Sequence, residues 1–182
     1  MKKKSFYLVI LCFFALTTAI LITGCQKSEN KSDPQYQQMK QLAKNEKQWL
    51  NETEPLAEKT KSLYSKWGNK EITWDELNQQ YIDIHNNLKV IKSKYEKYMK
   101  ENPLSKETEN SPDYKEGLLY GKTMRSDLNN FLYTVTNGYI TKSTKQVTKL
   151  NEQQLKILYQ DRIEKNYNEH LQKLQISLKK YE

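Results

Sequence analysis

Glycine, proline and arginine are scarce in this sequence, and each scarcity excludes something. Only 5 glycines and 4 prolines occur in 182 residues, and arginine occurs only at Arg125 and Arg162. A chain that is poor in glycine and proline but rich in lysine, glutamate, glutamine and leucine favours long helices over sheets. Because arginine is the residue best suited to bidentate phosphate recognition, its scarcity argues against a dedicated phosphate site.

Motifs of catalysis are also missing. The sequence has no His-Glu-x-x-His metal motif, no Gly-x-Ser-x-Gly nucleophile and no glycine-rich phosphate loop. The two histidines, His85 and His170, stand on separate predicted helices, and we expect both at the surface or at a helix edge. They would hold a metal only if those two helices faced each other. We therefore expect a protein that is not an enzyme and binds no cofactor or metal.

Long apolar runs are absent from most of the chain, but one lies near its start. Three lysines follow Met1, the stretch of residues 6–22 is almost wholly apolar, and Thr23, Gly24 and Cys25 come next. A positive cluster, an apolar core and small residues are the layout of a secretory signal peptide. An uncleaved membrane anchor is the alternative, and under either interpretation the chain after Gly24 is exported.

The stretch Leu-Ile-Thr-Gly-Cys, residues 21–25, resembles the lipobox of bacterial prolipoproteins. The resemblance implies cleavage after Gly24 and a lipidated Cys25, which carries an S-diacylglycerol group and an N-acyl chain such as palmitate. Two or three acyl chains make a durable anchor, since each buried methylene contributes about 0.8 kcal/mol. We therefore expect the mature protein on the extracytoplasmic face of the cell membrane. Its net charge falls from +8 to +5, because three lysines leave with residues 1–24.

The mature chain divides into a tether and one domain. Residues 25–34 form the lipidated N-terminus and a polar, flexible tether, which spans roughly 15–18 Å as a coil. Residues 35–182 form the domain. The second cysteine, Cys12, lies in the removed segment, so the domain has no disulfide and is held together by its core alone.

Apolar residues recur at three- and four-residue steps through the domain, which predicts an all-α fold. We expect an elongated antiparallel bundle of about four long amphipathic helices. The first spans about 35–67, and Pro55 indicates either a kink in it or two abutting helices. The second begins at Thr73, which forms a capping box with Glu76, and ends near 101. Asn151 or Thr148 caps the last helix, and the state of 139–149 stays open.

The third helix begins at Ser111-Pro112-Asp113, and its apolar residues alternate steps of four and three. That alternation predicts packing against its neighbours at shallow angles. Gly117 and Gly121 indicate a close crossing with another helix. Arg125 lies on the same seam, where it either pairs with a buried acid or extends its stem past the edge.

Two surfaces are candidates for binding. Trp67 and Trp74 flank the turn between the first two helices, where their rings either stack on sugars or close the end of the core. Lys142, Lys145 and Lys149 share one face if their segment is helical, and they form either an anion-binding patch or an ordinary solvated face.

These features predict a lipid-anchored, non-catalytic protein that binds or scaffolds an unknown envelope protein. Long amphipathic helices without catalytic motifs suit that role. The alternative is a binder of an anionic wall polymer or a glycan, which would use the lysine patch and the two tryptophans. Nucleic acid is not expected as a partner, because an exported lipoprotein rarely meets it.

Overall fold

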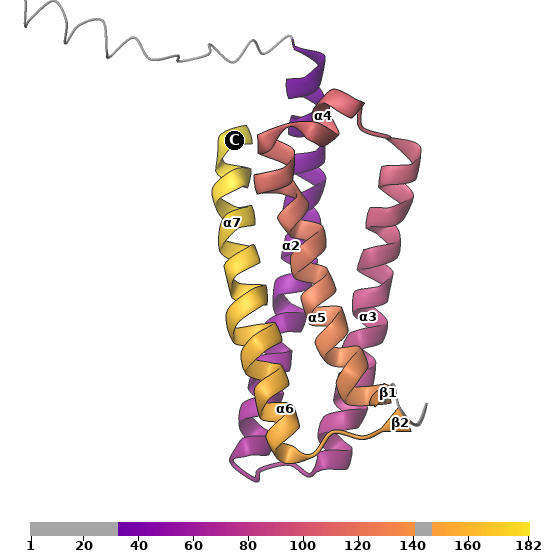
Figure 1. Cartoon of the computed structure of the whole chain (residues 1–182), viewed down its shortest axis with the longest axis vertical. Coiled ribbons are helices and arrows are strands. Elements are labelled where there is room, and N and C mark those ends of the chain that lie inside the picture. The colour runs from indigo at the N-terminus through magenta and orange to yellow at the C-terminus, as the bar shows by residue number, and fades with distance from the viewer. Residues whose placement is uncertain (1–32, 141–146) are drawn as a thin grey trace, which may run out of the picture.

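The computed structural model of this protein describes residues 33–140 and 147–182. The all-α prediction is confirmed, since long helices dominate both ranges. Helices α2 (Pro34–Gly68), α3 (Trp74–Glu101) and α5 (Leu119–Asn137) run along the long axis of the molecule (Figure 1). A C-terminal helical run lies beside them and consists of α6 (Glu152–Tyr159), the π-helix η2 (Gln160–Tyr167) and α7 (Asn168–Leu178).

Neighbouring helices alternate in direction along the chain (Figure 1). Helix α3 packs against both α2 and α5, and α5 packs against η2 and α7. One end of the molecule holds the start of α2 and the short 3-10 helix η3 (Lys179–Tyr181). The opposite end holds the turn between α2 and α3 and the start of α6. At about 1.5 Å per residue, the 35 residues of α2 separate the two ends by about 50 Å.

Smaller elements join the long helices. The segment 102–111 contains the short helix α4 (Lys106–Asn110), whose start is capped by the hydroxyl of Ser105. A π-helical turn, η1 (Tyr114–Leu118), leads directly into α5. After α5, strand β1 (Tyr139–Ile140) pairs antiparallel with β2 (Val147–Thr148). The part of 139–149 that the structure describes is therefore extended.

Helix α2 continues through Pro55, so the prediction of two abutting helices is wrong. Proline removes one backbone hydrogen bond, the one that the carbonyl of Asn51 would accept. Both residues lie on the exposed side of the helix, so that carbonyl is on the side open to water. On the buried side, the hydroxyl of Thr53 donates to the carbonyl of Trp49 at 2.7 Å. The local break in the hydrogen-bond ladder therefore faces solvent and not the core.

The predicted capping box of Thr73 is present, and a second one, which was not predicted, begins the last helix. The amide of Thr73 donates to the carboxylate of Glu76 at 2.7 Å, and the amide of Glu76 donates back to the Thr73 hydroxyl at 3.3 Å. Asn151, and not Thr148, caps the last helix, through a reciprocal pair of bonds with Gln154 at 2.9 and 3.0 Å. Caps of this type stabilise a helix by about 1 kcal/mol each.

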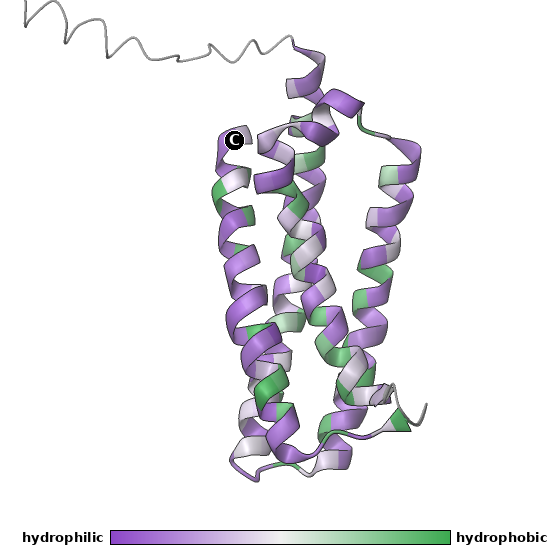
Figure 2. Cartoon of the chain, viewed as in Figure 1, coloured by the Kyte–Doolittle hydropathy of each residue, from purple (hydrophilic) through white to green (hydrophobic). Residues whose placement is uncertain are grey.

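Apolar residues recur along each long helix amid polar residues (Figure 2), and most of them are buried. The core is continuous over the length of the molecule and includes several large side chains with essentially no exposure: Leu42, Leu77, Tyr81, Leu88, Leu128, Phe131, Ile163 and Tyr167. Within 33–140 and 147–182, no helix is both long and apolar enough to cross a membrane.

Candidate functional site

Arg125 and Glu46 form a buried ion pair between α5 and α2. Two nitrogens of the guanidinium donate to the two carboxylate oxygens at 2.7 and 2.9 Å, and each side chain is 1% exposed. The guanidinium also lies over the rings of Trp49 and Tyr95, at 5.5 and 4.9 Å from their centroids. The structure thus decides between the two alternatives for Arg125, because the stem does not extend past the edge.

The two glycines of η1 and α5 make room for close helix contacts. A Cβ atom at Gly121 would overlap the carboxylate of Glu46, with the Cδ atom only 2.6 Å away. At Gly117, a Cβ atom would meet the side chain of Ser177 on α7. Gly121 therefore leaves the space in which Glu46 reaches Arg125. Burial raises the pKa of Glu46, and the Arg125 guanidinium opposes this rise.

The histidines do not meet, so the conditional metal site is not formed. His85 lies on α3 with its Nε2 atom 3.3 Å from the amide oxygen of Asn129, and it is 4% exposed. Its expected surface or edge position is therefore wrong, because α5 covers that side of α3. His170 is partly exposed on α7, with Nδ1 2.7 Å from a carboxylate oxygen of Asp127. The described residues contain no group of three metal-binding side chains.

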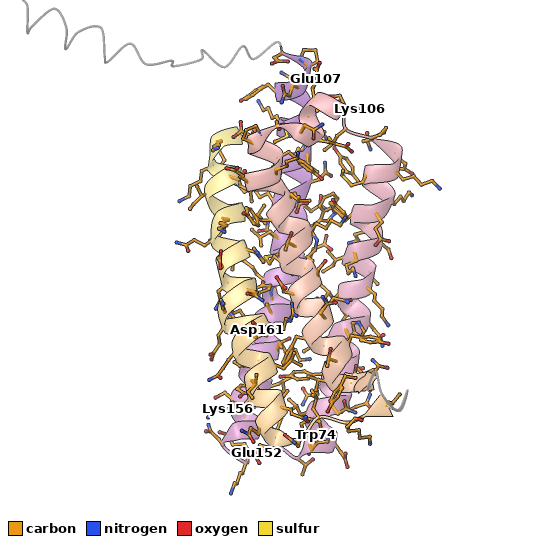
Figure 3. All side chains as sticks on the ribbon, viewed as in Figure 1. Trp74, Lys106, Glu107, Glu152, Lys156 and Asp161 are labelled. Carbon is orange, nitrogen blue, oxygen red and sulfur yellow. The ribbon has the colours of Figure 1, made fainter. Side chains whose placement is uncertain are left out.

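The two tryptophans pack on each other at the end opposite the start of α2, where Figure 3 labels Trp74. The Trp67 and Trp74 rings meet edge to face at 5.8 Å, and both are partly buried against the core. Tyr64 lies beside Trp67 and stacks on Tyr159 at 3.6 Å. This packing favours the interpretation in which the tryptophans close the end of the core.

Only one of the three lysines of the predicted patch lies within the described residues. Lys149 is exposed just after β2, whereas Lys142 and Lys145 lie outside the described residues. Cys25 and the cleavage position after Gly24 also lie outside them. The lipidation site and the full lysine patch therefore stay predictions from the sequence.

A surface groove that the sequence analysis missed lies between α5, the start of β1 and the α6–η2 run. It encloses about 460 Å³ and has apolar walls from Tyr139, Leu150, Ile157 and Leu158. Ile157 is 58% exposed, and unlike Ile176, which is 57% exposed, it lines this groove. The sequence holds a signal for this groove, because Leu155, Ile157 and Leu158 give α6 more apolar residues than one buried face needs.

Polar groups define the rim of the groove. The amide nitrogen of Gln154 donates to the hydroxyl of Tyr139 at 3.0 Å and ties α6 to the start of the hairpin. Asp161 and Arg162 provide one charge of each sign, 3.3 Å apart. Asp161 is half exposed and is labelled in Figure 3 along the C-terminal run. The groove therefore combines an apolar floor with charges at its edge.

No family model, curated protein or solved structure matches this chain. The inference of function therefore depends on the residues themselves.

Proposed function

We propose that this chain is a lipid-anchored, extracytoplasmic bacterial protein that acts without catalysis and docks another envelope protein at its membrane-distal end. The observation that carries the docking function is the apolar groove with its exposed Ile157. The lipobox-like sequence of residues 21–25 supports the anchor.

The position of the groove agrees with such an anchor. Helix α2 begins at Pro34, only nine residues after Cys25, so its start faces the membrane if Cys25 is lipidated. The groove lies near the other end of the molecule, formed by the start of α6 and the β1 residue Tyr139 (Figure 1). A length of about 50 Å would then project the groove away from the bilayer. A partner embedded in or bound to the envelope can reach it there.

The chemistry of the groove indicates the kind of partner. Its walls fit an amphipathic segment with two or three aliphatic residues, the mode by which helices enter hydrophobic grooves. Complete burial of an aliphatic side chain such as Ile157 contributes about 1.5–3 kcal/mol relative to exposure. Charges on the partner that complement Asp161 and Arg162 would fix its orientation more than its affinity.

Docking is tested with a matched pair of variants. Ile157→Asp places a charge in the groove, and Ile176→Asp makes the same change at a site on α7 that is 57% exposed, against 58% for Ile157. Pull-downs from detergent-solubilised envelopes at high salt should retain one protein with the unchanged chain and with Ile176→Asp, and lose it with Ile157→Asp. Equal retention by both variants would contradict docking at the groove.

The anchor is tested with Cys25→Ser. The unchanged chain should fractionate with membranes and incorporate labelled palmitate, whereas the variant should keep its signal peptide and incorporate no label. Normal processing and lipid labelling of Cys25→Ser would show that the lipobox interpretation is wrong.

A further inference from the structure

A second, smaller cleft lies between α3 and α5. Its walls come from Lys92, Tyr95 and Glu96 on α3 and from Lys122, Arg125 and Ser126 on α5. Its volume of about 110 Å³ is well below the roughly 300–1,000 Å³ of typical small-molecule pockets. The cleft therefore suits one small ion better than an extended ligand.

The two lysines give this cleft a positive potential. Neither Lys92 nor Lys122 forms an ion pair with any residue in the described part of the chain. The charge of Lys92 acts on its surroundings: together with Lys89 it helps burial to lower the pKa of the neighbouring His85. Glu96 offsets one positive charge, so the walls of the cleft keep a surplus.

Arg125 lines the cleft, but its charge is already paired and is not available to bind an anion. Two of its nitrogens already donate to Glu46, which neutralises its charge, and the ring of Tyr95 covers the guanidinium. The hydroxyl of Ser126 donates to the carbonyl of Lys122 at 2.9 Å, so it is also engaged. An anion in the cleft would therefore be held mainly by two ammonium groups.

We propose that this cleft binds a single phosphate group between Lys92 and Lys122, above the buried Arg125–Glu46 pair. Lysine binds phosphate as a point charge, without the pair of parallel hydrogen bonds that an arginine guanidinium donates. The site would therefore be an exception to the expectation, drawn from the presence of only two arginines, that the chain has no dedicated phosphate site. The proposed phosphate site depends neither on the lipid anchor nor on the docking groove. It lies between α3 and α5, whereas the groove lies between α5 and the α6–η2 run.

The test is a titration of the purified full chain in zwitterionic micelles, followed through backbone amide NMR shifts. Inorganic phosphate is added in one arm and glycerophosphoglycerol in the other, each against potassium chloride at equal ionic strength. Saturable shifts confined to residues around Lys92 and Lys122 are expected in at least one arm. Saturation by inorganic phosphate alone identifies a free phosphate ligand, and saturation by the diester identifies a phosphodiester such as that of a headgroup or polymer.

Charge variants give the matched control. Lys92→Gln and Lys122→Gln should each weaken binding about fivefold, and Glu96→Gln should strengthen it by a similar factor, as expected for single charges about 4 Å from the ligand that are fully screened by water. Lys156→Gln, an exposed site on α6, should leave binding unchanged. Shifts that do not saturate in either arm, or that chloride reproduces, would overturn the proposal. So would equal effects of Lys92→Gln and Lys156→Gln.

Discussion

Replacing Arg125 with methionine would leave the carboxylate of Glu46 buried without its partner. Both side chains are 1% exposed, and the pair has two hydrogen bonds of 2.7 and 2.9 Å. Breaking a buried pair by removing one member destabilises a protein by about 3–5 kcal/mol, because the remaining charge stays desolvated. We therefore expect Arg125→Met to lower the free energy of unfolding by that amount, measured by urea denaturation with circular dichroism.

The double variant Glu46→Leu, Arg125→Met separates the interaction from the charge that is left behind. Removing both groups leaves no buried charge, so its stability should be close to that of the unchanged chain or up to about 1–4 kcal/mol higher. Arg162→Met is the control, because Arg162 is partly exposed and contacts Asp127 at 3.5 Å. Asp127 is buried but keeps its contact with His170, so the loss of the partly solvated Arg162 contact should cost about 1 kcal/mol.

The pH dependence of Arg125→Met provides a second readout. Burial raises the pKa of Glu46 above its unfolded value, and removal of Arg125 takes away the group that opposes this rise. A carboxyl group with a raised folded pKa favours the folded state at pH below its unfolded pKa, and this contribution is lost as pH rises through the folded pKa. The deficit of Arg125→Met should therefore shrink on acidification. A deficit that is below 1 kcal/mol at neutral pH, or that grows in acid, would refute the reasoning.

Three further variants test the close packing at Gly121, the titration of His85 and the helix cap at Asn151. Gly121→Ala should destabilise by about 1–3 kcal/mol, because its Cβ overlaps Glu46, whereas Gly68→Ala has open space and should change urea stability little. Burial lowers the pKa of His85, so its contribution to stability is present above the unfolded pKa and is lost as pH falls through the folded pKa. His85→Gln should therefore flatten the fall in thermal stability between about pH 7 and 5, and an unchanged pH profile would contradict this role of His85. Asn151→Ala should lose about 1 kcal/mol in urea denaturation, and an unchanged midpoint would contradict its role as a cap.

Helix positions were predictable from the sequence because their signals are local. The capping box of Thr73 and Glu76 follows from neighbouring residues alone. Pro55 was ambiguous, since an interior proline either kinks or breaks a helix, and it leaves the carbonyl four residues earlier without its hydrogen bond. The side on which that carbonyl lies depends on which face α2 buries, and only the packed structure shows it.

The buried polar contacts were not predictable in the same way, because they depend on pairs far apart in the chain. Arg125 was recognised as a seam residue, but nothing near it in the sequence identifies Glu46, 79 positions away, as its partner. His85 follows a core residue, and its burial depends on the cover that α5 provides. The apolar groove around Ile157 likewise forms only when Tyr139 and Leu150 come together with α6.

The central claim is that the groove around Ile157 docks a protein of the envelope. Its most direct test is a photo-crosslinking amino acid placed at position 157 or, as a control, at position 176, in the otherwise unchanged chain in intact cells. Ultraviolet irradiation and mass spectrometry should identify one specific envelope protein joined through position 157 and absent from the adducts of position 176. No protein adduct at position 157, or the same set of adducts at both positions, would contradict the claim.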